Sequence, residues 1–258
     1  MEFDLIGLAI AFLIAVVGGM INGIAGGGTV LVFPMLVWLG LDPVEANITN
    51  AVSLWTASLG GALGFGRALR GTDRFWYWMA IPAAIGGVAG ALLLVALPAD
   101  IFASTAPYFV LASAIIMLLQ PTLRRRVERF TGSLRNGIGT RAVSVTGLLL
   151  ISIYGGYFGA GLGIFMLVAL SLLGVEDLLQ ANGLKNIFGF LIKGVAVLSF
   201  VVTGNVIWTI ALVLMVGSIL GAYVAARVGS RVGPRPMRIA IIIIGFLMAA
   251  LMFAGIAD

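Results

Sequence analysis

The sequence contains neither cysteine nor histidine. The absence of cysteine excludes disulfides and thiol chemistry, and the two absences together exclude the usual zinc sites and haem ligation. Without histidine the chain also lacks the commonest general base of enzymes. The apolar runs hold no clustered pair of carboxylates and no G-x-S-x-G motif, which argues against an intramembrane enzyme acting on lipid. We therefore predict a protein without enzymatic activity and without cofactors.

Charged residues are scarce. They make up 10% of the 258 residues, hydrophobic residues make up 61%, and the mean hydropathy is +1.17. Soluble domains average about 25% charged and about 45–50% apolar residues, so the composition predicts an integral membrane protein. Several apolar runs reach the roughly 20 residues that a membrane helix needs, and none alternates like a barrel strand. The net charge of +5 comes from arginines between the runs, where membrane orientation explains it without nucleic acid.

The apolar runs that we expect to be helices lie between charged or turn-rich breaks. They cover residues 5–23, 29–39, 48–65, 75–97, 104–119, 142–158, 164–173, 183–202, 206–226 and 239–256. The runs 29–39 and 164–173 are too short to cross a bilayer alone, and each follows a cluster of glycines. The first run has Glu2 and Asp4 where a signal peptide would have basic residues, so we expect a retained helix.

Three arginine-rich loops set the predicted orientation. The most basic, residues 121–141, holds six arginines and divides the chain near its middle, and the others cover residues 67–74 and 227–238. The positive-inside rule places all three in the cytoplasm. When the membrane crossings between these loops are counted, the unit 5–39 begins and ends outside the cell, whereas the unit 142–173 begins and ends inside. We therefore predict a first repeat over 1–120, a cytoplasmic connector over 121–141 and a second repeat of opposite orientation over 142–258.

A motif recurs in the two halves at a constant spacing. The stretch 25-AGGGT-29, followed by 46-AN-47, matches 160-AGLGI-164, followed by 181-AN-182, at an offset of 135 positions. Inverted repeats with broken helices are characteristic of secondary transporters. The predicted fold class is therefore an all-α integral membrane protein with two inverted-topology repeats and glycine-interrupted elements, which are either re-entrant or fully spanning.

The glycine clusters mark a candidate site. Backbone that leaves a helix at membrane depth must be buried in protein or face a water-filled cavity. The short helices beginning near Thr29 and Ile164 would offer free N–H groups and positive dipole ends, which suit an anion. The glycines expected at this site are Gly26, Gly27, Gly28, Gly161 and Gly163. Close packing between helices is the alternative role for them.

Lys185 and Lys193 are the only lysines in the chain. On a helix they would be about 80° and about 12 Å apart, so both can face one cavity. An unpaired charge at mid-depth in a membrane costs at least about 2.5–3.5 kcal/mol and normally marks a pathway or a ligand. We therefore predict contact with an anionic substrate. Snorkelling to the headgroups stays open for Lys185, and contact with a carbonyl or a lipid phosphate stays open for Lys193.

Neutral polar residues beside the breaks complete the predicted site. Asn47 and Asn182 occupy equivalent repeat positions, and asparagine can donate to an oxyanion or bond to a neighbouring helix. The predicted neutral contacts are Thr29, Asn47, Asn50, Asn182 and Asn186, with Asn22, Thr49, Ser53 and Tyr157 as further polar residues nearby. We predict no metal site.

Each half contains a glycine cluster, a short apolar run and an A-N helix start, as in 23-GIAGGGTVLVFPMLVWLGLDPVEANITN-50 and 159-GAGLGIFMLVALSLLGVEDLLQANGLKN-186. This paired pattern resembles the TauE/SafE family of sulfite and organosulfonate transporters over nearly the whole chain. Leu162 interrupts the second glycine cluster, which departs from the fuller triple-glycine pattern. The resemblance implies a permease of the bacterial plasma (inner) membrane that moves sulfite, sulfoacetate or a similar small anion by alternating access. Lys185 and Asn186 stand at the family-like K-N positions.

The residues leave other functions and the coupling ion open. A passive anion channel and a transporter of a small carboxylate are the alternatives. Proton coupling usually needs an acid or histidine at membrane depth, which requires Glu45 or Asp177 to reach inward, whereas Na⁺ could bind to carbonyl, Asn and Thr oxygens at the breaks. The expected partners are thus a small anion, the lipid bilayer and either H⁺ or Na⁺. Whether the chain forms a homo-oligomer stays open.

Overall fold

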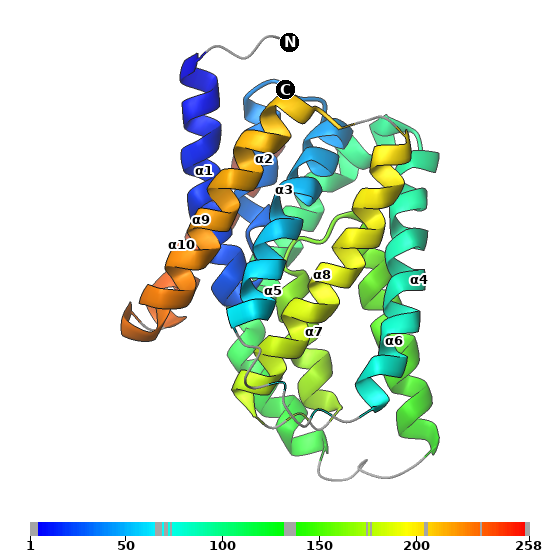
Figure 1. The fold of residues 1–258 in the computed structure, drawn as a ribbon. Helices are drawn as coiled ribbons and strands as arrows, with labels where there is room; N and C mark the ends of the chain where they lie inside the picture. The colour runs from blue at the N-terminus through cyan, green and yellow to red at the C-terminus, as the bar shows by residue number, and fades with distance from the viewer. Residues whose placement is uncertain are drawn as a thin grey trace.

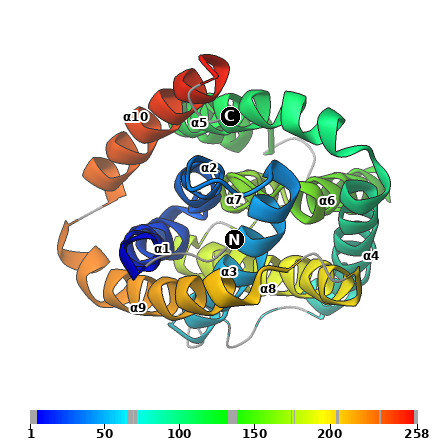
Figure 2. The same cartoon turned by 90° about the horizontal axis from the view of Figure 1, so that it is seen from above.

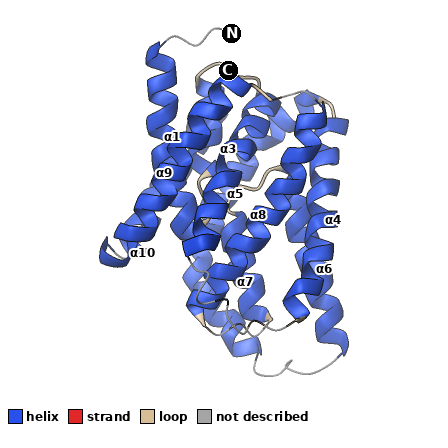
Figure 3. Cartoon of the chain, viewed as in Figure 1, coloured by secondary structure: helices blue, strands red, loops and turns tan. Residues whose placement is uncertain are grey.

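The computed structural model describes residues 5–64, 69, 72, 74–131, 138–173, 175, 177–203, 206–232 and 234–255. Over these residues the chain is helical and contains no strand (Figures 1 and 3). The helices are α1 (Leu5–Ala25), α2 (Thr29–Trp38), α3 (Pro43–Gly64), α4 (Phe75–Ala96), α5 (Ala99–Thr131), α6 (Ile138–Tyr157), α7 (Leu162–Leu172), α8 (Leu178–Thr203), α9 (Trp208–Val232) and α10 (Pro234–Phe253). The all-α prediction is confirmed.

The glycine clusters separate α1 from α2 and α6 from α7. Gly26, Gly159 and Gly161 have φ values of 72°, 72° and 70°, in the left-handed region that glycine enters without steric cost. The helices that follow, α2 and α7, have 10 and 11 residues. The two short helices predicted from the sequence are therefore present, and glycine conformation separates each from the helix before it.

Seen from above, α2 and α7 lie in the middle of the molecule and the longer helices surround them (Figure 2). The most extensive helix–helix contacts recur when the two halves exchange roles. Helix α1 packs against α9 as α6 packs against α4, α3 against α9 as α8 against α4, and α2 against α10 as α7 against α5. A parallel internal repeat and an inverted one would both give these exchanged contacts. The inverted orientation of the two halves therefore stays a prediction.

Residues 135 positions apart behave alike in the structure. Asp42 Oδ1 accepts a hydrogen bond from the Val44 N–H at the start of α3, and Asp177 Oδ1 accepts one from the Leu179 N–H at the start of α8, each at 2.9 Å. Aspartate at this position caps a helix N-terminus. Both caps occupy the same place in their half, which supports the internal repeat.

Helices α3 and α8 pack against each other where the two halves meet. Trp55 stacks on Phe190 with ring centroids 5.2 Å apart, and its Nε1 donates to the Phe190 carbonyl oxygen at 3.0 Å. These two residues are also 135 positions apart. A residue that lies near a pseudo-twofold axis contacts the equivalent residue of the other half. Trp55 and Phe190 therefore mark the place where the two halves meet.

The outside of the molecule is apolar. Leu5, Tyr77 and Val202 are 84%, 71% and 86% exposed, which a soluble protein would avoid over so wide a surface. Among the described residues, five helices are long and apolar enough to cross a membrane: α1, α4, α5, α8 and α9. The chain is therefore a multi-pass membrane protein.

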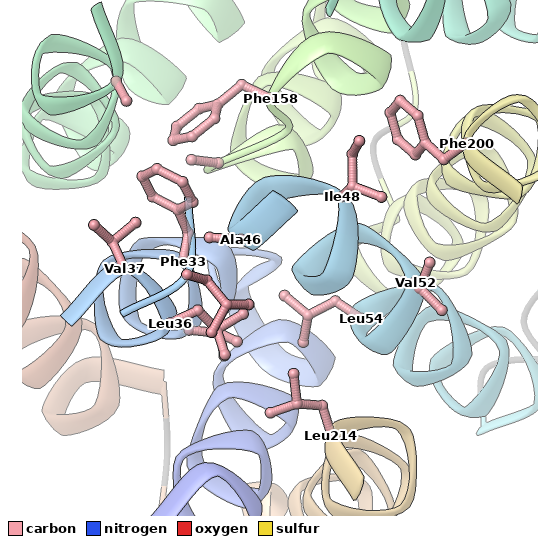
Figure 4. Close-up of a cluster of buried hydrophobic side chains, with 14 of the residues drawn as sticks. Phe33, Leu36, Val37, Ala46, Ile48, Val52, Leu54, Phe158, Phe200 and Leu214 are labelled. Carbon is pink, nitrogen blue, oxygen red and sulfur yellow. The ribbon is translucent and has the colours of Figure 1, made fainter. Parts of the chain in front are cut away.

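The core lies around the first short helix. Phe33 of α2 faces Phe158, which follows α6, with ring centroids 5.1 Å apart at an interplanar angle of 85° (Figure 4). Ile48 and Leu54 of α3 belong to the same buried cluster. Edge-to-face aromatic packing of this kind stabilises beyond the burial of area. It ties the first short helix to the second break.

Several helix boundaries differ from the predicted runs by four or more residues, including the starts of α5, α6 and α10 at Ala99, Ile138 and Pro234 and the end of α9 at Val232. Helix α5 continues to Thr131, whereas the run ended at residue 119, because Arg and Glu favour a helix although they are not apolar. Helices α3 and α8 begin at Pro43 and Leu178, before the predicted starts at 48 and 183.

Most of the arginines that set the predicted orientation lie outside the residues whose side chains the structure describes. The predicted orientation is therefore untested.

Candidate functional site

A small cavity lies between α1, α3, α7 and α8. Its volume is about 20 Å³, enough for about one water molecule. The residues that line it are Asn22, Gly26, Ser58, Leu162, Gly163, Lys185, Asn186, Gly189 and Lys193. Both glycine breaks and both lysines of the chain thus reach the same small space.

Lys185 and Lys193 are 3% and 5% exposed. Within the described part of the chain, the Lys185 Nζ is buried and has no hydrogen-bond partner. The acidic side chains whose exposure the structure describes, those of Asp42, Glu45, Asp100 and Asp177, are all exposed. Neither Glu45 nor Asp177 therefore reaches inward, and none of these acids lies buried beside the lysines.

The buried polar atoms without a partner sort by helix. Among the described residues, those on α8 are the donors Lys185 Nζ and Asn186 Nδ2, and those on α3 are the amide oxygens Asn47 Oδ1 and Asn50 Oδ1, which can only accept, and the Thr49 hydroxyl, which can accept or donate. The two donors belong to the cavity lining, whereas the three oxygens on α3 do not. Buried donors normally have an acceptor. The cavity therefore suits a ligand that accepts hydrogen bonds and carries negative charge.

The two breaks touch at the cavity. The Gly163 N–H donates to the Gly26 carbonyl oxygen at 3.4 Å. A Cβ added to Gly26 would lie 2.5 Å from the Gly163 Cα, closer than any side chain permits. Close packing, one of the two roles weighed from the sequence, is therefore present at Gly26. On the same cavity, Asn22 Nδ2 donates to Ser58 Oγ at 3.5 Å and joins α1 to α3.

Side chains from α5 and α6 hold the second break. The Tyr154 hydroxyl donates to the Ala160 carbonyl oxygen at 2.7 Å, and the Ser113 hydroxyl donates to the same oxygen at 3.0 Å. The Ser113 and Tyr154 hydroxyls are 3.2 Å apart. A backbone carbonyl that has no helix hydrogen bond at a break needs such donors, because lipid supplies none. These bonds fix the backbone that leads to Gly161 and Gly163.

Two asparagines of α3 contact the breaks directly. Asn47 Nδ2 donates to the carbonyl oxygen of Tyr157, the last residue of α6, at 2.8 Å. Asn50 Nδ2 donates to the Oγ1 of Thr29, the first residue of α2, at 3.3 Å. Asparagine used in this way bonds neighbouring helices, which was the alternative to oxyanion contact.

The predicted contacts divide into two groups. Those that line the cavity are Gly26, Gly163, Lys185, Asn186 and Lys193; those that do not are Gly27, Gly28, Thr29, Asn47, Asn50, Gly161 and Asn182. Substrate binding by either group stays a prediction. Among the described residues, no cluster of three or more His, Cys, Asp or Glu side chains is placed to hold a metal ion.

Ser58, Leu162 and Gly189 line the cavity without having been predicted. Ser58 lies 135 positions before Lys193, so the repeat offset applied to the lysine would have identified it. Leu162 and Gly189 carry no polar side chain; the sequence distinguishes Leu162 only as the residue that interrupts the second glycine cluster, and it gives no signal for Gly189.

Comparisons with known proteins agree over nearly the whole chain. A family model described as Sulfite exporter TauE/SafE matches residues 11–252. The chain is 30% identical over 251 residues to a probable membrane transporter protein of Haemophilus influenzae, covering 95% of this chain and 94% of that protein. It is 27% identical to the probable membrane transporter protein ORF9 of Sinorhizobium sp (96% of this chain and 92% of that protein). It is also 27% identical to the probable membrane transporter protein YfcA of Escherichia coli K12 (94% and 88%). No solved structure matches the chain significantly.

Proposed function

The chain belongs to the sulfite exporter TauE/SafE family and is a membrane transporter, not an enzyme, and from this premise we propose that it carries a small anion. Sulfite or an organosulfonate such as sulfoacetate is the proposed substrate, since the family description names sulfite. The relatives named above are bacterial proteins. This supports the inner membrane of a bacterium as the proposed location.

One observation carries the proposal. Lys185 and Lys193 are buried on one cavity, and no described acid lies buried beside them. An ion without a counter-ion in a membrane interior is destabilising and is kept where a ligand supplies the opposite charge. A bound oxyanion would accept from both ammonium groups and from Asn186 Nδ2, and the N-terminus of α7 at Gly163 would add its positive dipole end.

The size of the cavity supports alternating access as the mechanism. A volume of about 20 Å³ is too small for sulfite, which has four heavy atoms, because it holds about one water. Binding of the anion then requires the residues that line the cavity to move apart. Such closure suits a carrier that exposes its site to one side at a time, and it argues against a continuously open anion channel.

The test is thermal unfolding of the purified protein with choline salts of sulfite, sulfoacetate, taurine, sulfate, thiosulfate and small carboxylates. A ligand that binds the folded protein stabilises it by about 2.7 kcal/mol at a concentration of about 100 Kd. We expect sulfite or a sulfonate to raise the Tm of the wild type in a saturable way, and Lys193→Met to lose that rise. A hit would then be tested for saturable, exchangeable flux in liposomes.

The matched control is Leu198→Met, which introduces the same residue at a 65% exposed position of the same helix. It should retain the full ligand response. An equal response in wild type and Lys193→Met would show that the lysine does not bind the anion. A response to carboxylates alone would replace the sulfur substrate with a carboxylate, and no response to any anion would overturn the proposal.

A further inference from the structure

The unpaired oxygen atoms of α3 point to a second site. Asn47 and Asn50 are each 1% exposed, and the Oδ1 of each is buried without a hydrogen-bond partner in the part of the chain that the structure describes. They lie one turn apart on α3, about 60° apart around the helix axis. Buried amide oxygens are normally paired, so a partner other than this chain is expected here.

The nitrogen atoms of these amides are tied to the two breaks. The Tyr157 carbonyl oxygen can only accept, so Asn47 must turn its nitrogen toward Tyr157 and its oxygen away from it. Asn50 reaches Thr29 Oγ1, a further oxygen that is itself buried, at 1% exposure. The amide groups of Asn47 and Asn50 therefore lie beside the end of α6 and the start of α2.

The chemistry of this set selects its ligand. The oxygens are all neutral, and two helix ends of opposite dipole sign meet at the set, the C-terminus of α6 at Tyr157 and the N-terminus of α2 at Thr29. Ca²⁺ and Mg²⁺ sites use carboxylates, and no buried acid is among the described side chains. Neutral oxygens at the carbonyl end of a broken helix suit an alkali cation instead. We propose that Asn47, Asn50, Thr29 and the Tyr157 carbonyl bind Na⁺.

The internal repeat gives an independent argument. Asn50 and Lys185 are 135 positions apart, so an amide with an unpaired oxygen stands where the other half places an ammonium. Each half then holds one positive charge at this position, covalently in Lys185 and as a bound ion beside Asn50. Thr49, whose hydroxyl is the third unpaired oxygen on α3, lies about 100° from Asn50 around the helix and is not part of the site.

The cation site has a consequence for coupling, and this step alone rests on the proposed anion function. Bound Na⁺ adds to the two lysine charges, and like charges repel strongly in a low-dielectric interior. An anion in the cavity offsets that repulsion. Each ligand then raises the affinity for the other by the same factor, because binding linkage is reciprocal. Na⁺ and the anion are therefore carried together.

The test combines two measurements on the purified wild type. The first is the Tm in sodium gluconate against choline gluconate at constant ionic strength, and the second is binding of radioactive sodium. We expect a saturable rise in Tm with sodium only, and saturable binding. Asn50→Leu keeps the side-chain volume but removes the oxygen, and it should weaken sodium binding by at least about tenfold.

Ser152→Ala is the control, because it removes a buried hydroxyl that already donates to the Leu148 carbonyl, and it should leave sodium binding unchanged. Since Asn50→Leu can fail to fold, binding is normalised to the monodisperse fraction and Asn47→Leu is measured in parallel. Equal Tm shifts in sodium and choline, or sodium binding unchanged in both asparagine variants, would overturn the site and leave water as the occupant.

The same titrations separate this inference from the proposed function. A sodium response without any anion response would support the cation site and overturn the anion function. An anion response without a sodium response would overturn the cation site alone. Sodium affinity that does not rise when choline sulfite is added would overturn the coupling step.

Discussion

At the scale of single residues, Lys185 is a charge that the ligand-free protein has to tolerate. Its Nζ is buried without a described partner, and replacing even a buried ion pair with apolar side chains of similar volume is often neutral or stabilises a protein by about 1–4 kcal/mol. We therefore expect Lys185→Met to raise the Tm of the ligand-free protein and to weaken its anion response. Thermal unfolding beside Leu198→Met checks this. A lower Tm in ligand-free Lys185→Met would mean that the ammonium has a stabilising partner.

The sequence identified both lysines because their charge is unusual in an apolar run, and the structure brings them to one cavity. It could not identify Ser58 in that way, since a serine is common in membrane helices and only the repeat relates it to Lys193. The contact of Asn47 with Tyr157, 110 positions away, was equally out of reach. Such a contact depends on where the fold places the end of α6 beside Asn47, and no local pattern encodes that.

At the scale of elements, the breaks depend on glycine conformation, and Gly26 is the critical position. Its φ is 72° and an added Cβ would lie 2.5 Å from the Gly163 Cα. A side chain in the left-handed region costs about 1–2 kcal/mol, and the close contact adds to this cost by pushing the two breaks apart. We expect Gly26→Ala to lower the Tm and to reduce anion transport in liposomes.

Gly147→Ala on α6 is the matched control, because an added Cβ there meets nothing within 4 Å. Alanine is favoured over glycine in a helix by up to about 1 kcal/mol, so this variant should keep or raise the Tm. If Gly26→Ala behaves like Gly147→Ala, the first break is adaptable and the rigid contact between the breaks is not required.

The sequence predicted where the helices lie and where they break, since hydropathy and glycine clusters are local signals. It was less accurate at the ends. Polar residues such as Asn47 continue a helix when they are buried against a neighbour, and the start of α3 at Pro43 lies ahead of the apolar run. The cap at Asp42 explains that start, because its carboxylate satisfies an N–H of the first turn.

At the scale of the whole molecule, the two halves share their packing but not their chemistry. Lys185 and Lys193 of the second half stand opposite Asn50 and Ser58 of the first, 135 positions earlier. The twofold exchange therefore holds for the helix contacts and not for the charges. A symmetric framework with unequal half-sites can hold two different ions, an anion on the lysine side and a cation on the asparagine side.

The opposite orientation of the halves is testable because the chain contains no cysteine. Ala99, which begins α5 and is exposed, and Pro234, which begins α10, are 135 positions apart. The arginine loops place residue 99 outside the cell and residue 234 in the cytoplasm. We expect a membrane-impermeant maleimide to label Ala99→Cys in intact cells and Pro234→Cys only after permeabilisation, with the unsubstituted chain as the unlabelled control. Labelling of both from the same side would show that the halves run in parallel. Alternating access by exchange of two inverted halves would then lose its structural basis.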